Sequence, residues 1–178
     1  MSINFFYTRI TLLGFLHCWL SNFKFSECNP KKTGKVKLSS CSASSEHDSD
    51  HSCDKSFDGD KDGKEWAITT DAVGIGSWIK INFDGFYRIT KVKTYPRSKE
   101  EEMFKDISLE FGDETTENFT LGNVVEWSDL VLTETAASNY VKITGLDVYG
   151  DGKNGFKEIE VFGCAIGEKT NNSHIDWQ

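Results

Sequence analysis

Three aspartates at alternate positions, followed by a glycine, lie in the segment FDGDKDGKEW at residues 57–66. The four residues are Asp58, Asp60, Asp62 and Gly63. Ca²⁺ takes about six to eight oxygen ligands, and a helix-loop-helix calcium loop also needs a bidentate Glu at its twelfth position. Counted from Asp58, that position is Thr69, and no flanking helices are predicted. The segment is therefore interpreted either as a different kind of calcium site or as an acidic turn without an ion.

A second group with metal-binding chemistry lies in the segment EHDSDHSCD. His47 and His51 are four residues apart here, beside Asp48, Asp50 and Asp54. Histidine and carboxylate side chains can bind zinc or copper. Four-residue spacing brings two side chains together only on a helix, and this Ser- and Asp-rich segment is predicted to be a loop. We therefore favour a solvated loop over a metal site.

A third group could bind sugar. Tyr95 and Arg97 lie in the segment TYPRSKEEE, and Trp127 lies in a later loop. An aromatic ring can stack on the apolar face of a sugar while a charged side chain holds its hydroxyls. In the alternative interpretation, which the sequence favours, Tyr95 packs at the end of the domain and Arg97 pairs with a local Glu.

The sequence predicts no catalytic site. A hydrolase triad needs a base beside a nucleophile, and beyond the N-terminal segment the histidines are the two in the loop described above and His174. No Gly-rich loop is suited to a phosphate. The net charge of −8 disfavours nucleic acid and anionic lipid as partners. The chain is predicted not to be an enzyme.

Short alternating runs of apolar and polar residues predict about eight strands. The run SWIKINF places Ile79, Ile81 and Phe83 on one face, and a turn at Asp84 and Gly85 is expected to separate it from the next strand. The linking segments are rich in Gly, Asp, Asn and Ser. Trp66 and Trp78 lie within strand patterns and are predicted to belong to the core. The pattern indicates an all-β, antiparallel sandwich or jelly roll.

The N-terminal residues 1–26 differ in composition from the rest. Arg9 precedes an apolar run at residues 10–20, which is typical of a secretory signal peptide. A retained anchor or a buried helix is the alternative, although the run is short for a membrane span. The sequence predicts no transmembrane segment, an extracellular location, a domain at 27–164 and a flexible tail at 165–178.

The cysteines fit a secreted, oxidised domain. Of the five, Cys18 lies in the predicted signal peptide. The remaining four allow three pairings, and we favour Cys28 with Cys164, which ties the ends of the domain, and Cys41 with Cys53, which closes a short loop. Two predicted glycosylation acceptors also fit secretion, Asn118 and Asn171.

Eight segments follow one another in an order that resembles the galactose-binding-like, discoidin-type family. This family includes the coagulation-factor type C domains and many sugar-binding modules. The segments are SCSASSE (40–46), SFDG (56–59), EWA (65–67), GSWIKINF (76–83), ITKVKTYPR (89–97), ISLEFGD (107–113), YVKITGL (140–146) and GFKEIEVFGC (155–164). The resemblance covers roughly residues 36–164 and looks closest to an uncharacterised invertebrate and microbial branch. It implies an eight-stranded, antiparallel jelly-roll β-sandwich.

The resemblance also implies a structural calcium ion. Related domains hold one between the loop after the first strand and the start of the last strand. In this sequence, the positions that match the calcium ligands of the related domains are Asp58, Asp60 (through its carbonyl), Thr69 and Glu158. Asp62 has no counterpart. Such an ion would clamp the first loop to the last strand and would not act as a switch.

Together, these features predict a secreted, non-catalytic binding or adhesion module. Its expected partners are extracellular glycans or matrix components, and its expected cofactor is Ca²⁺. The alternative is an acidic structural protein of extracellular organic matrix, including mineralised skeletons, with no specific sugar ligand. The basic triad of fucose-binding relatives has no clear match in the chain.

Overall fold

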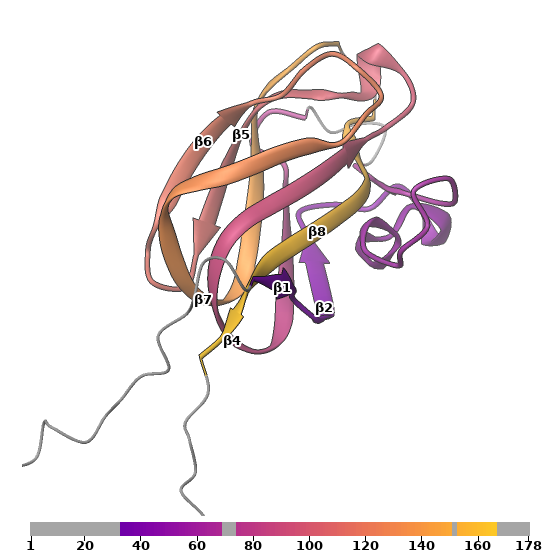
Figure 1. The fold of residues 1–178 in the computed structure, drawn as a ribbon. Coiled ribbons are helices and arrows are strands. Elements are labelled where there is room, and N and C mark those ends of the chain that lie inside the picture. The colour runs from indigo at the N-terminus through magenta and orange to yellow at the C-terminus, as the bar shows by residue number, and fades with distance from the viewer. Residues whose placement is uncertain (1–32, 69–73, 151–152, 167–178) are drawn as a thin grey trace, which may run out of the picture. The chain divides into compact units, whose positions relative to one another are not determined.

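The computed structural model describes residues 33–68, 74–150 and 153–166. Within these ranges, eight strands form a continuous, mainly antiparallel sheet that folds into two layers (Figure 1). The strands are β1 (Gly34–Lys35), β2 (Leu38–Ala43), β3 (Trp66–Ala67), β4 (Trp78–Pro96), β5 (Phe104–Phe111), β6 (Thr116–Thr120), β7 (Ser128–Val148) and β8 (Gly155–Ala165). Three short 3₁₀ helices connect them: η2 (Ser49–His51), η3 (Cys53–Ser56) and η4 (Glu100–Glu102). The predicted all-β sandwich is confirmed.

Strands β4 and β7 belong to both layers. Residues 79–83 of β4 pair with β2, and residues 78–82 pair with the second half of β7. Further along, residues 87–96 pair with β8, and residues 87–94 pair with the first half of β7. The register shifts between Asn82 and Tyr87, where the strand crosses from one layer to the other. The turn predicted at Asp84 and Gly85 is therefore wrong. Because β4 is continuous from Trp78 to Pro96, the two expected strands are one.

The core lies between the two layers and follows the alternation of the strands. Ile79, Ile81 and Phe83 are buried, as predicted. They belong to the same cluster as Val92 from the second half of β4 and Ile159 from β8. Full burial of such an aliphatic side chain stabilises a fold by about 1.5–3 kcal/mol. The alternation visible in the sequence therefore accounts for both layers.

An aromatic cluster closes the core near the start of β8. The rings of Trp66, Phe104 and Phe156 lie 5.1–6.3 Å apart between centroids. Trp66 is fully buried, as predicted, and its indole N–H donates to the carbonyl of Ser45 at 3.0 Å. Trp78 is only half-buried, with the Lys142 ammonium 5.7 Å from its ring. The prediction that Trp78 belongs to the core is wrong. In this part of β4, Ile79, Ile81 and Phe83 point inward, and Trp78 lies on the opposite face.

Strand β1 pairs with the end of β8, and Gly34 lies opposite Gly163. The loops after β4, β6 and β7 gather at the other end of this folded unit (Figure 1). None of the helices in the described ranges is long and apolar enough to span a membrane. The predicted signal peptide at 1–26, and residues 167–178 of the predicted tail, lie outside the described residues.

Candidate functional site

Glu158 in β8 is a buried carboxylate with one unpartnered oxygen. The residue is 2% exposed, and its Oε2 accepts a hydrogen bond from the backbone N–H of Gly59 at 3.2 Å. Among the described residues, no donor reaches Oε1. Desolvation raises the pKa of Glu158 to about 7, although the Gly59 N–H favours the charged form. A buried charge or polar atom without a partner costs free energy, so this oxygen marks a place where a cation would be favourable.

The turn that meets Glu158 is held by aspartates that accept from nearby backbone groups. Asp58 Oδ1 accepts the Asp60 N–H at 2.9 Å, and Asp60 Oδ1 accepts the Asp62 N–H at 3.1 Å. Gly59 has a φ of 89°, in the left-handed region that favours glycine. After desolvation, the charge of Asp58 also raises the Glu158 pKa. The turn therefore places the carboxylates of Asp58 and Glu158 close enough for their negative charges to repel each other.

Three of the four predicted calcium ligands, Asp58, Asp60 and Glu158, lie within the described residues. Asp58 and Glu158 come together across the turn, while the Asp60 carbonyl accepts the Gly63 N–H at 3.0 Å and keeps a second lone pair. Thr69 lies outside the described residues. All these donors are oxygens, which Ca²⁺ prefers. A divalent cation would satisfy Glu158 Oε1 and offset the repulsion between the two carboxylates, so the residues present fit calcium.

Tyr95 and Trp127, two of the three predicted sugar-contact residues, lie against each other. Their ring centroids are 5.3 Å apart, with the rings inclined at 66°. Both side chains are half-buried. The ammonium groups of Lys61 and Lys93 lie 5.6 Å and 4.8 Å from the Tyr95 and Trp127 ring centroids, respectively. We call these four residues the aromatic–lysine surface. The Tyr95 hydroxyl also donates to the carbonyl of Val125 at 3.3 Å, which ties the loop before β7 to this surface.

Arg97, the third predicted sugar-contact residue, is buried and paired. It is 7% exposed. Its Nη2 lies 2.8 Å from Glu65 Oε1 and 3.4 Å from Glu102 Oε2, and its Nη1 donates to the carbonyl of Lys153. This is the alternative that the sequence favoured, in which Arg97 pairs with nearby glutamates. Arg97 holds the end of β4 to three other segments and is not part of the aromatic–lysine surface.

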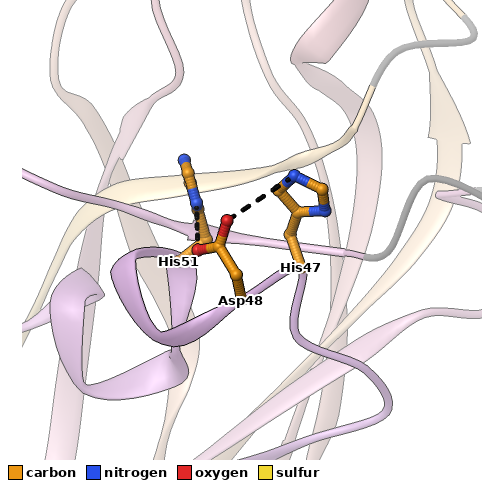
Figure 2. A group of neighbouring side chains, drawn as sticks. All are labelled: His47, Asp48 and His51. Atoms are coloured by element: carbon orange, nitrogen blue, oxygen red, sulfur yellow. Dashed lines mark hydrogen bonds and ion pairs between the residues drawn. The ribbon is translucent and has the colours of Figure 1, made fainter.

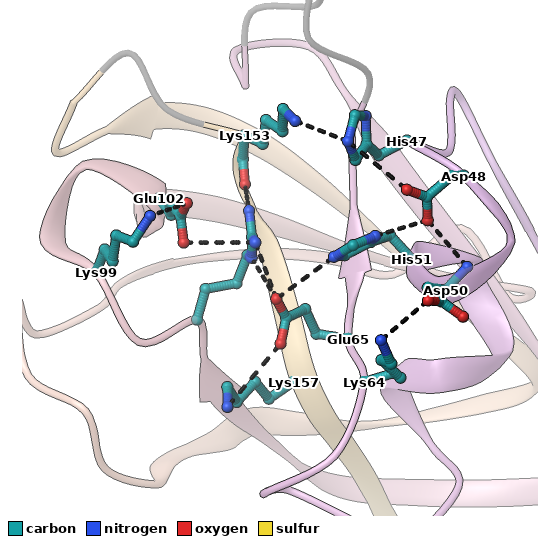
Figure 3. A network of polar contacts seen from close by, with 11 residues as sticks. His47, Asp48, Asp50, His51, Lys64, Glu65, Lys99, Glu102, Lys153 and Lys157 are labelled. Carbon is teal, nitrogen blue, oxygen red and sulfur yellow. Dashed lines mark hydrogen bonds and ion pairs between the residues drawn. The ribbon is translucent and has the colours of Figure 1, made fainter.

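Glu65 connects Arg97 to the histidine-containing loop. Its Oε1 lies 3.9 Å from His51 Nε2, and its Oε2 lies 3.9 Å from Lys157 Nζ (Figure 3). The network continues on the other side from Arg97 through Glu102 to Lys99 at 3.3 Å. Charges from four separate segments of the chain therefore meet at this end of the folded unit.

His47, Asp48 and His51 are brought together in the loop that was predicted to be solvated (Figure 2). Asp48 Oδ1 lies 2.7 Å from His51 Nδ1, and Asp48 Oδ2 lies 3.7 Å from His47 Nε2. The hydrogen bond from His51 holds the pKa of Asp48 below its usual value. The interpretation as a loop overlooked the single 3₁₀ turn η2, which places both half-buried rings on the same carboxylate.

One of the favoured cysteine pairs is present in the structure. Cys41 in β2 and Cys53 in η3 form a disulfide across 12 residues. Cys164 is also disulfide-bonded, but Cys28, its predicted partner, lies outside the described residues. Asn118 is exposed on β6, whereas Asn171 lies outside the described residues. Glycosylation at either position stays a prediction.

Lys93, Lys61 and Glu65 are among the residues of these sites that were not predicted from the sequence. Lys93 could have been found, because it alternates with Tyr95 on the outward face of β4. Lys61 lies in the acidic segment, whose alternating aspartates point to a cation site and not to a sugar. Glu65 is 32 residues from Arg97 in the sequence, and no periodicity predicts a pair at that separation.

The family model of the F5/8 type C domain matches residues 40–160. None of the curated protein sequences compared with the chain matches it. Several solved structures share its fold. A family 32 carbohydrate-binding module of NanJ from C. perfringens, in complex with galactose, has a TM-score of 0.64 at 13% identity, covering 73% of this chain and 98% of that chain.

Two further structures show the same similarity of fold. The module CpGH89CBM32-5 from Clostridium perfringens, in complex with GalNAc-β-1,3-galactose, has a TM-score of 0.63 at 17% identity, with 73% of this chain and all of that chain covered. A chitosan-binding module from a Paenibacillus sp. IK-5 chitosanase/glucanase, in complex with chitotriose, has a TM-score of 0.60 at 20% identity, covering 72% of this chain and 98% of that chain. At these identities the similarity concerns the fold.

Proposed function

The chain belongs to the F5/8 type C domain family, and we propose that it is a secreted, non-catalytic module that binds carbohydrate through the aromatic–lysine surface. The shared fold supports a binding role, since the solved structures of similar fold include modules with bound galactose and chitotriose. Fold does not determine function, so the proposal depends on a site. The observation that carries it is the contact between the half-buried rings of Tyr95 and Trp127, with a lysine beside each ring.

The chemistry of this surface suits a sugar. The aromatic rings offer apolar area to the C–H face of a sugar ring. The ammonium groups of Lys61 and Lys93 are donors only, so they suit hydroxyl or carboxylate oxygens. Because each ammonium group already lies near an aromatic ring, a bound sugar would share the surface with both lysines. We therefore expect sugars with acidic groups to bind more tightly than neutral ones.

We further propose that Ca²⁺ binds between Asp58 and Glu158 in a structural role. The support is the unpartnered Oε1 of Glu158, a carboxylate whose other oxygen accepts from Gly59 in a turn built from acidic residues. When bound, the ion would supply the positive charge that the buried carboxylate lacks. Asp58 and Glu158 would hold it, with the Asp60 carbonyl available as a further ligand. The ion would join the loop after β2 to the start of β8 without taking part in sugar binding.

A glycan array probed with the full chain, with neutral and acidic saccharides side by side, tests the proposed sugar site. Trp127→Ala is expected to abolish binding. Trp78→Ala is the matched control because Trp78 is also a half-buried Trp with a lysine near its ring, but it lies in the part of β4 that pairs with β2. Binding that survives Trp127→Ala, or is lost equally in Trp78→Ala, would contradict the proposed site.

The acidic charge supports a second candidate function, a structural protein of extracellular organic matrix. The net charge of −8 suits basic proteins or a mineral surface. Secretion is part of both candidates, and the Cys41–Cys53 disulfide supports it, because disulfides persist mainly in oxidising compartments. Recovery of the protein in insoluble matrix, with no binding on the glycan array, would favour the matrix role.

A further inference from the structure

His47, Asp48 and His51 offer two ring nitrogens and a carboxylate to the same small volume (Figure 2). One ligand atom from each residue lies within 4.8 Å of the other two. Zinc binds histidine nitrogen and carboxylate oxygen at about 2.0–2.2 Å, which places two tetrahedral ligands roughly 3.3 Å apart. Asp48 is exposed while both rings are half-buried, so an ion can approach from the carboxylate side. Small side-chain rotations would bring the three donors into range.

The backbone that carries these donors is held by its own hydrogen bonds. The His47 N–H donates to the carbonyl of Ala67 at 2.9 Å, which attaches this loop to β3. The Asp48 side chain caps η2 by accepting the Asp50 N–H at 2.9 Å, and the His51 N–H donates to the Asp48 carbonyl at 3.1 Å. The loop is therefore already ordered in the folded protein, so binding an ion would require little further loss of backbone conformational entropy.

Covalent and side-chain contacts fix both ends of the same loop. The Cys41–Cys53 disulfide joins η3, which follows the cluster, to β2, which precedes it. Glu46, next to His47 in the sequence, accepts the Cys53 N–H at 2.8 Å. These contacts limit how far the two histidines can separate.

The hydrogen bonds also indicate which ring nitrogen of each histidine accepts or donates. An ammonium group only donates, so His47 Nε2 accepts from Lys153 Nζ, 2.7 Å away, and carries a lone pair. A carboxylate only accepts, so His51 Nδ1 donates to Asp48. His51 Nε2 lies 3.9 Å from Glu65 Oε1. If His51 bound an ion through Nδ1, its Nε2–H would point to a carboxylate, the outer-shell arrangement common at metal-bound histidines.

We propose that His47 Nε2, Asp48 and His51 Nδ1 bind a divalent transition-metal ion of the zinc and copper class. Imidazole nitrogen selects these ions over Ca²⁺, which prefers oxygen ligands. The ion replaces the Lys153 ammonium at His47 and the proton of His51 Nδ1. Three protein ligands leave at least one coordination position for water or for a donor from a partner. This site is separate from the proposed calcium and sugar sites and does not depend on either.

Isothermal titration of the untagged full chain with Zn²⁺, in saturating Ca²⁺ to fill oxygen-rich sites, tests the proposal. Loss of an outer-shell partner typically lowers metal affinity by about 10–100-fold. His47→Gln and His51→Gln each remove a ligand and are expected to lower the Zn²⁺ affinity by at least that factor. Lys153→Met removes the competing ammonium and is expected to raise the affinity by about tenfold, the equivalent of one charge-assisted hydrogen bond.

Two control variants separate this cluster from other Zn²⁺ ligands. Asp50→Asn changes a carboxylate on the same 3₁₀ helix that pairs with Lys64 at 2.9 Å and is expected to leave the affinity unchanged. His174→Gln removes a histidine outside the described residues and should also have no effect. Absence of Zn²⁺ binding, or equal affinity in His51→Gln and the unaltered chain, would overturn the proposal. A melting curve for each variant shows that it is folded.

Discussion

Glu158 in β8 and Gly59 in the acidic turn are 99 residues apart in the sequence, and the carboxylate of the first accepts the backbone N–H of the second. This hydrogen bond, together with the ion pair between Glu65 and Lys157, joins the loop after β2 to the last strand. The other oxygen of the same carboxylate is buried without a donor among the described residues. Where these two segments meet, the described residues therefore supply a donor to one oxygen of Glu158 and leave the other without one.

Glu158→Gln is expected to stabilise the calcium-free protein and to remove its response to calcium. The neutral amide keeps an acceptor for Gly59 and is less costly to bury, so the gain in EDTA should be about 1–3 kcal/mol. Thermal melts in EDTA and in millimolar Ca²⁺ measure both effects. Glu160→Gln, in the same strand and paired with Lys35 at 2.9 Å, is the control and should keep the response. If calcium did not change the melting temperature of the unaltered chain, the proposed calcium site would be contradicted.

Arg97→Met is expected to destabilise the fold without a specific effect on sugar binding. The change leaves the half-buried Glu65 and Glu102 without the guanidinium of the buried Arg97, and breaking a buried pair costs about 3–5 kcal/mol. Lys99→Met is the control, because Lys99 is an exposed partner of Glu102 and an exposed pair is worth about 0–1 kcal/mol. Denaturant unfolding measures the stability. If Arg97→Met kept full stability but lost glycan binding, Arg97 would be a contact residue after all.

Gly155→Ala is expected to destabilise the aromatic end of the core. A Cβ on Gly155 would collide with the backbone carbonyl of Trp66, which cannot rotate away because β3 is paired with β8 there. Overpacking of this kind costs about 1–3 kcal/mol or more. Gly34→Ala is the matched control, since its Cβ would meet no atom within 4 Å. Equal unfolding midpoints for the two variants would show that β3 can shift away from β8.

Replacement of Cys41 and Cys53 by Ser together is expected to cost about 2–4 kcal/mol, the usual contribution of a disulfide that closes a short loop. The same change frees the loop that carries His47 and His51, so Zn²⁺ affinity should fall as well. Unfolding in guanidinium measures the first effect, and titration with Zn²⁺ the second. Unchanged Zn²⁺ affinity in the folded double variant would mean that hydrogen bonds alone hold the cluster.

The fold was largely predictable because its strands alternate. Spacing alone predicted that one face of the strand carries Ile79, Ile81 and Phe83. The order of the motifs predicted the architecture. The continuity of β4 was not predictable, because Asp84 and Gly85 are turn-forming residues by type. In the structure the Asp84 N–H donates to the carbonyl of Lys37, a residue 47 positions earlier in the sequence, and the strand continues through both residues.

The candidate sites were less predictable because they depend on contacts between distant segments. Tyr95 and Trp127 were identified by residue type, but their contact follows from the pairing of β4 with β7. Arg97 was a candidate sugar contact because it follows Tyr95, although the sequence favoured its pairing with a local Glu, and it pairs with Glu65 and Glu102 in the structure. The histidines were dismissed on spacing, because a single 3₁₀ turn leaves little trace in a sequence.

The passage of β4 through both layers has a consequence for cooperativity. Its residues 79–82 cannot leave the first layer without straining residues 88–95 in the second, because both halves belong to one continuous strand and each half pairs with β7, on either side of the register shift between Asn82 and Tyr87. Local opening of either layer alone is therefore costly. Backbone amides in the two halves of β4 should exchange their hydrogens with solvent only when the whole domain opens, and so with similar protection.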